Sequence, residues 1–245
     1  MSTVFAPEAD QPAVVLVHGA FAESSSWNGV VSRLQSAGLP VLAVANPLRG
    51  LAPDAEYLRT VIDRIDGPVV VAGHSYGGSV LSEATEGASN VRALVFVASF
   101  LLEPGESTGE LAGRFPGGEL GAALTPVPFT AGGFRGDDLY IDQPKFRGVF
   151  AADVAEEEAA LMAATQRPIA GAALEDAATA AGWRSIPSWT LITRQDLAVP
   201  LESQRFMAER AGSHAVEIDA SHAVTVSQPG AVADLVLEAV RATGR

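Results

Sequence analysis

Short apolar runs alternate along this chain with segments in which apolar residues recur at the spacing of a helix. The runs are rich in Val, Ile, Leu and Ala and hold few polar positions. Such runs are typical of strands whose two faces are both covered by helices. The expected strands are residues 13–17, 41–45, 69–72, 91–98, 188–193 and 215–218. We therefore predict an α/β fold with a six-stranded, mainly parallel sheet flanked by helices.

Helical segments follow the first, second and last of these runs, and two more are expected at residues 77–86 and 201–211. The apolar positions are Trp27, Val30, Val31 and Leu34 in the first segment, Leu58, Val61, Ile62 and Ile65 in the second, and Val232, Leu235, Val236 and Val240 in the last. Gly38 ends the first segment, and Gly67 with Pro68 ends the second, because these residues disfavour continuation of a helix.

The alternation breaks between residues 101 and 182. Gly and Pro cluster at residues 115–118 and 130–133, and an Ala-rich helical stretch follows at residues 153–165. We interpret this segment as a mostly helical cap, inserted into a core formed by residues 1–100 and 183–245. The alternative is a set of surface loops, but so long a structureless connection is unusual in a compact domain.

The amino-acid composition disfavours several classes of function. Hydrophobic residues make up 48% of the 245 positions, and the formal net charge is −13. The charge disfavours nucleic acid as a partner. With no cysteine, the chain has no thiolate nucleophile, disulfide or Cys-ligated metal. The N-terminus lacks the features of a signal peptide, and no apolar run approaches the roughly 20 residues that span a bilayer, so we expect a cytoplasmic protein without a membrane partner.

The strongest chemical signal is the sequence GHSYGG at residues 73–78, directly between a predicted strand and a predicted helix. In that context a G-x-S-x-G motif forms a sharp turn that exposes the serine hydroxyl, so Ser75 is the candidate nucleophile. The alternative is a glycine-rich turn that binds phosphate at a helix N-terminus. The turn holds no lysine, and the chain has no G-x-x-x-x-G-K-[ST] motif, which disfavours that reading.

A serine needs a base, and the chain has four histidines. His74 lies inside the turn, and we assign His18 a packing role. His214 begins the last strand and so lies at the wrong end of the sheet. His222 follows that strand at the end where such sites form, and it is the candidate base.

The acid that orients the base should follow the preceding strand, where Asp196 lies. Asp219 competes, but it is only three residues before His222 on the same loop, too close for the required geometry. The alternative role for Asp196 is to form a turn or cap a helix. Two backbone N–H groups should stabilise the oxyanion, those of Tyr76 and Ala20, with Phe21 as a second choice for the latter.

A pocket should lie between Ser75 and the cap. Its candidate lining and substrate-binding residues are Phe21, Phe129, Phe134 and Phe146, with Tyr140 and Phe150 as further candidates. The cap residues among them could equally form the core of the cap. An aromatic lining suits small apolar or aromatic esters. The cap could also form half of a homodimer interface.

The chain resembles the branch of α/β-hydrolases that includes plant methyl esterases, hydroxynitrile lyases and small bacterial esterases. The motifs that carry the resemblance are VHGA at 17–20, GHSYGG at 73–78, QDLAVP at 195–200 and SH at 221–222. The resemblance implies a six-stranded sheet, a helical cap over an apolar pocket, and a triad of Ser75, Asp196 and His222. The lyases carry threonine where this chain has Gly19 and lysine where it has Ala223, which favours ester hydrolysis.

We therefore predict a serine carboxylesterase that works through an acyl-enzyme and needs no metal or organic cofactor. One alternative is a cofactor-free lyase or dioxygenase that uses His222 and Asp196 as a proton-abstracting pair. Another is a ligand receptor of the same fold with little turnover.

Overall fold

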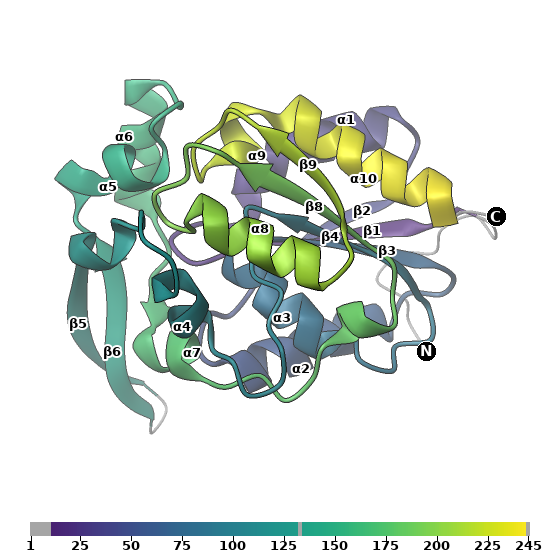
Figure 1. Cartoon of the computed structure of the whole chain (residues 1–245), viewed down its shortest axis with the longest axis horizontal. Coiled ribbons are helices and arrows are strands. Elements are labelled where there is room, and N and C mark those ends of the chain that lie inside the picture. Colours follow the sequence, from purple (N-terminus) through teal and green to yellow (C-terminus); the bar gives the residue numbers. More distant parts are fainter. Residues whose placement is uncertain (1–10, 132–133, 244–245) are drawn as a thin grey trace.

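Six parallel strands form the central sheet of the computed structural model, which describes residues 11–131 and 134–243. In sheet order the strands are β2 (Val41–Val44), β1 (Ala13–Val17), β3 (Val69–His74), β4 (Val91–Val97), β8 (Ser188–Thr193) and β9 (His214–Ile218). Every pair of neighbours is parallel (Figure 1). The predicted fold class is confirmed.

Helices cover both faces of this sheet, which explains why its four inner strands, β1, β3, β4 and β8, are mostly apolar and almost entirely buried. One face packs against α1 (Asn28–Ser36), α9 (Val224–Ser227) and α10 (Pro229–Thr243). The other packs against α2 (Leu51–Ile62), α3 (Tyr76–Ala84) and α8 (Leu201–Arg210). Within β1, Val14 and Leu16 belong to the first core, and Val15 and Val17 belong to the second. None of the helices within the described ranges is both long enough and apolar enough to cross a membrane.

The segment between β4 and β8 carries most of the remaining elements and lies to one side of the sheet (Figure 1). Its helices are α4 (Thr108–Gly113), α5 (Gln143–Phe150), α6 (Glu156–Thr165) and α7 (Gly171–Glu175), with short 3-10 turns at Leu120–Ala123 and Gly182–Arg184. Helix α6 lies within the predicted helical stretch. Helix α5 was not predicted from the pattern.

The same segment also contains a three-stranded antiparallel sheet that the sequence pattern did not predict. Strands β5 (Leu124–Ala131) and β6 (Phe134–Ile141) form a hairpin, and β7 (Ile169–Ala170) pairs with β6. Pro126 and Pro128 make β5 hard to predict as a strand, because proline has no N–H to donate to the hydrogen bonds of a sheet. Strand β5 is an edge strand, and these two alternate positions share one side of it, so both prolines are tolerated there.

Candidate active site

Ser75 occupies the tight turn between β3 and α3. Its backbone has φ 53° and ψ −126°, a conformation that L-residues rarely adopt. The turn is held from β4 and the loop after it: the Ser75 N–H donates to Val97 O at 3.2 Å, and Ser99 Oγ donates to Ser75 O at 2.6 Å. Although the residue is only 7% exposed, it lines a small cavity. The strained turn therefore places Ser75 at this small cavity.

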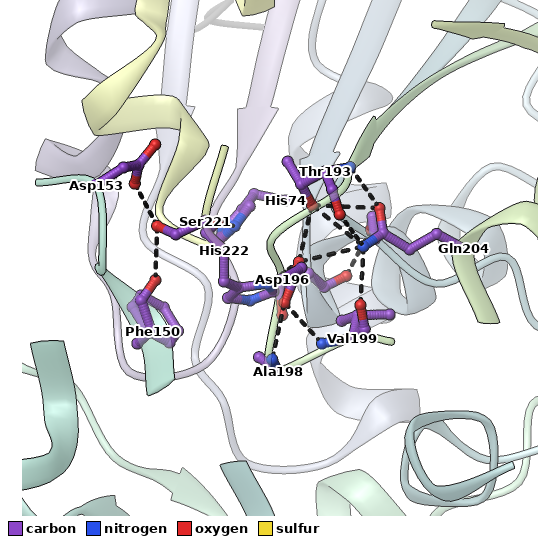
Figure 2. Close-up of polar contacts among 12 residues, drawn as sticks. His74, Phe150, Asp153, Thr193, Asp196, Ala198, Val199, Gln204, Ser221 and His222 are labelled. Atoms are coloured by element: carbon purple, nitrogen blue, oxygen red, sulfur yellow. Dashed lines mark hydrogen bonds and ion pairs between the residues drawn. The ribbon is translucent and has the colours of Figure 1, made fainter. Parts of the chain in front are cut away.

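His222 and Asp196 meet from two loops at the C-terminal ends of β9 and β8. His222 Nδ1 lies 2.8 Å from Asp196 Oδ2, and both side chains are buried (Figure 2). His222 Nε2 is also buried, and no residue of the described chain hydrogen-bonds to it. The Asp196 carboxylate can thus hold the Nδ1–H tautomer and leave the Nε2 lone pair available as a base.

Asp196 is fixed by more partners than the histidine alone. Its Oδ1 accepts the N–H groups of Ala198 and Val199, each at 2.8 Å. Its Oδ2 accepts from Thr193 Oγ1 at 2.9 Å and from Gln204 Nε2 at 3.2 Å (Figure 2). The turn-forming role considered as an alternative is therefore real, and the same carboxylate contacts His222 as well. Sequence reasoning missed Thr193 and Gln204, since only the packing of α8 against β8 brings Gln204 to this loop.

The loop that carries His222 is held by contacts with residues far away in the sequence, which no local sequence pattern predicts. His74 Nε2 lies 2.8 Å from His222 O, and the two imidazole rings are 4.7 Å apart. From the cap, Phe150 packs edge-on against the His222 ring at 4.8 Å and accepts the Ala223 N–H through its carbonyl at 2.9 Å. Ser221 Oγ donates to the carboxylate of Asp153 (Figure 2). The cap thus helps to position the histidine that the core presents.

Asp219 and His214, the other candidates for the acid and the base, contact other residues. Asp219 is exposed and pairs with Arg194 at 2.7 Å. His214 is exposed at the start of β9, where it stacks on Trp189 with ring centroids 5.2 Å apart. Neither residue is among the partners of His222, so of the candidate acids and bases only Asp196 and His222 are brought together by the fold.

The two candidate oxyanion donors flank Ser75. Among the described residues, neither the Ala20 N–H nor the Tyr76 N–H has a hydrogen-bond partner. The Phe21 N–H, our second choice, donates to Arg167 O at 3.0 Å and is therefore occupied. Tyr76 is the first residue of α3, whose dipole favours negative charge at that end. Ala20, Ser75 and Tyr76 line the same cavity.

His18 holds the peptide that carries the Ala20 N–H. The Asn46 N–H donates to His18 Nε2 at 3.0 Å, so the proton of the neutral ring is on Nδ1, which lies 2.9 Å from Gly19 O. Burial lowers the pKa of His18 to about 4, so the ring is neutral near pH 7. In a trans peptide the N–H points opposite to the C=O, so a fixed Gly19 O also fixes the direction of the Ala20 N–H.

The sequence predicts that the Ala20 N–H stabilises an oxyanion, and a donor of this kind acts mainly in the transition state. Replacing His18 with alanine is therefore expected to lower kcat about tenfold or more, with a small change in KM. Steady-state kinetics with the ester substrates predicted from the sequence would measure this. Asn46→Ala is the control: it removes the bond from Asn46 Nδ2 to His18 O, 3.0 Å, but leaves Gly19 O held. Equal kcat losses in the two variants would contradict a specific role of His18 in aiming the donor.

Two buried histidines, His18 and His74, should make the stability of the protein depend on pH. Burial lowers the pKa of His74 to about 3, with the nearby His222 adding to the effect. Between pH 6.5 and 4 the unfolded chain therefore binds protons at His18 and His74 that the native protein does not bind, so stability falls as pH falls. Each histidine should contribute a loss of about 2 kcal/mol between pH 7 and pH 5. The raised pKa of the buried Asp54 acts in the opposite direction.

Urea unfolding at several pH values would measure this slope. His74→Gln keeps a donor for His222 O but cannot titrate, so its slope should be shallower than that of the wild type. Gln35→Ala, at an exposed position in α1 and without a titratable group, should match the wild-type slope. An unchanged slope in His74→Gln would contradict the assignment.

The cavity beside Ser75 has a volume of about 50 Å³ and a largely apolar lining. Phe21 lines it, as predicted from the sequence. Phe146 instead packs under Phe150 in the cap core, with ring centroids 5.0 Å apart, and Phe129 lies on β5 with the Arg49 guanidinium 5.1 Å above its ring. Neither of these two is among the residues that line this cavity, and the Phe134 side chain lies outside the described residues.

The rest of the lining comes from both the core and the cap. It consists of Ala20, Tyr76, Phe100, Thr108, Gly109, Ala112, Leu120, Leu174, Ala198 and Val199. Within residues 11–131 and 134–243, no three His, Asp or Glu side chains gather as metal ligands would.

The chain is similar to known hydrolases in sequence and in fold. Residues 14–235 match the model of the "Alpha/beta hydrolase family". The chain is 30% identical to alpha/beta hydrolase nvfD of Aspergillus novofumigatus, over 94% of this chain and 96% of that one. It is 28% identical to the pyrethroid hydrolase of Sphingobium wenxiniae, over 92% and 86%. The structure of polyneuridine aldehyde esterase superposes with a TM-score of 0.79 at 23% identity, covering 93% of this chain and 98% of the other.

Proposed function

Since the chain belongs to the alpha/beta hydrolase family, we propose that it is a serine carboxylesterase acting on small apolar or aromatic esters. Ser75 is the nucleophile, His222 the general base and Asp196 the residue that orients the base. The observation that carries the proposal is the 2.8 Å contact between His222 Nδ1 and a buried carboxylate, at the same end of the sheet as a strained serine turn.

In the first half of the reaction, Ser75 Oγ attacks the ester carbonyl carbon while its proton passes to His222 Nε2. The carbonyl oxygen becomes an oxyanion that accepts hydrogen bonds from the Ala20 and Tyr76 N–H groups. The tetrahedral intermediate then collapses: the bond to the alcohol oxygen breaks, and that oxygen takes the proton from Nε2. In the second half, water gives a proton to Nε2 and attacks the acyl carbon, and the proton returns to Ser75 Oγ as the acid leaves.

The surroundings of Ser75 support this reading over cyanohydrin cleavage, for which the resembling lyases carry a threonine in place of Gly19. A Cβ at Gly19 would lie 2.7 Å from Ser75 Cβ and 2.8 Å from His74 O. Real Cβ atoms essentially never approach so closely, so this loop has no room for that side chain without rearrangement. The apolar cavity next to Ser75 suits an uncharged acyl group.

The test is intact-mass spectrometry after incubation with a fluorophosphonate, on the wild type and on Ser75→Ala, together with hydrolysis of p-nitrophenyl esters from acetate to octanoate. We expect one adduct in the wild type, none in Ser75→Ala, and rates that decline as the acyl chain outgrows the small cavity. A folded wild-type protein that neither reacts with the probe nor cleaves any ester would overturn the proposal in favour of a lyase, a dioxygenase or a receptor.

A further inference from the structure

A second cavity lies directly beside the one that contains Ser75. Its volume is about 230 Å³, several times larger than the cavity at the nucleophile. It runs between the loop that follows β1 and helix α6 of the cap. Its lining includes Ala22, Ser25, Leu161, Met162, Thr165 and Val226.

Phe21 is the residue that the linings of the two cavities share. Its backbone has a positive φ of 60° and is held by the N–H bond to Arg167 O at 3.0 Å. The side chain is only 3% exposed and packs edge-on against Phe150, with ring centroids 6.3 Å apart.

The second cavity borders the segment that follows His222. Val226, which lines it, is four residues after His222, and Phe21 packs on Phe150, which packs on the His222 ring. The small cavity is lined by Ala198 and Val199, whose N–H groups bind the Asp196 carboxylate on the Nδ1 side of the imidazole. In ester cleavage the base must protonate the departing alcohol oxygen, so the alcohol part of the substrate has to lie on the His222 side.

We infer that the larger cavity is the subsite for the alcohol part of the ester and that Phe21 is the gate residue between it and Ser75. The inference rests on the proposed function. The small cavity would then take the acyl part. The substrate class is esters of short carboxylic acids with bulky, uncharged alcohols. Leu161, Met162 and Val226 supply apolar contacts, and the carboxylates of Glu23 and Glu158 in the lining disfavour anionic alcohols.

Two isomeric esters test this assignment. Benzyl acetate carries its ring on the alcohol, and methyl phenylacetate carries the same ring on the acid. We expect the wild type to prefer benzyl acetate. Phe21→Ala should raise the ratio of the two kcat/KM values, benzyl acetate over methyl phenylacetate, by about tenfold, the usual effect of a modest change in an apolar pocket. Both esters react through the same catalytic groups, so any effect of the substitution on those groups cancels in the ratio.

Leu161 gives an independent test, should Phe21→Ala fail to fold. It is 67% exposed and lines the larger cavity, so Leu161→Asp should fold and should lower the same ratio about tenfold. Val127→Asp, which places the same charge at an exposed position on β5, should leave the ratio at the wild-type value.

Three outcomes separate the hypotheses. A shift of the ratio in the stated directions supports the alcohol subsite. If the ratio is unchanged in both Phe21→Ala and Leu161→Asp, or if methyl phenylacetate alone gains, the alcohol subsite is overturned. The proposed esterase activity still stands in that case, provided that the fluorophosphonate labels Ser75. Absence of labelling and of hydrolysis of both esters in the wild type overturns the proposed function itself.

Discussion

Replacing Ser75 with alanine is expected to lower kcat for ester hydrolysis about 10⁴- to 10⁶-fold, the loss usual when a triad nucleophile is removed. The alanine side chain lacks the oxygen that forms the acyl-enzyme, while the oxyanion donors and the pocket remain. The native serine is only 7% exposed at a strained turn, and alanine fits the same space, so unfolding by urea should change little. Steady-state kinetics on p-nitrophenyl acetate would measure the loss.

Ser32→Ala, at an exposed position in α1, is the matched control: it should fold, react with the fluorophosphonate at Ser75 and hydrolyse the ester as the wild type does. A sharper check uses non-additivity, because the members of a triad act as a unit. His222→Ala should cost nearly as much as Ser75→Ala, and the double variant should be scarcely worse than either. If Ser75→Ala retained most of its activity while His222→Ala lost it, the proton-abstracting pair of the lyase or dioxygenase reading would replace the triad.

Replacing Gly77 with alanine is expected to reduce the free energy of unfolding by at least about 3 kcal/mol, the upper part of the range for overpacking. A Cβ at this position would lie 2.4 Å from Val17 O and 3.1 Å from His18 O. Both are backbone atoms at the end of β1, an inner strand of the sheet, so neither can move aside at low cost. Chemical denaturation followed by circular dichroism would measure the change.

Gly148→Ala is the matched control. This glycine lies in α5, is exposed, and has no atom within 4 Å of the position a Cβ would take. Alanine there should stabilise the protein by about 0.5 to 1 kcal/mol through helix propensity. Equal effects of the two substitutions would show that backbone entropy, and not the close approach of α3 to β1, dominates at Gly77.

Much of the core could be predicted because its signals are local. Each strand is a short apolar run bounded by turn residues, and this pattern can be recognised in the sequence without knowing which strand pairs with which. The serine turn could be predicted for the same reason, since its glycines and the serine lie within six consecutive residues. Strand β3 continues to His74, two residues beyond its predicted end, because Gly73 and His74 still pair with Phe96 and Val97 of β4.

The cap was harder to predict, because its elements depend on pairing rather than on composition. Strand β5 contains two prolines and forms only because β6 folds back against it. Phe146 and Phe129 are aromatic residues of the kind expected in a pocket, yet the first packs in the cap core and the second lies under Arg49. Sequence shows which residues are apolar, but the choice between core and cavity is made by the neighbours that each side chain meets.

By itself, then, the sequence determined the six-stranded α/β core, the serine turn, and the order in which Asp196 and His222 follow their strands. All of these depend on periodicity and on residues close together in the chain. Tertiary structure alone decided that Gln204 and Thr193 fix Asp196, that His74 and Phe150 hold His222, and that Phe21 lines two cavities. Most of these contacts join segments far apart in sequence, and only the packed chain brings such segments within hydrogen-bond or van der Waals distance.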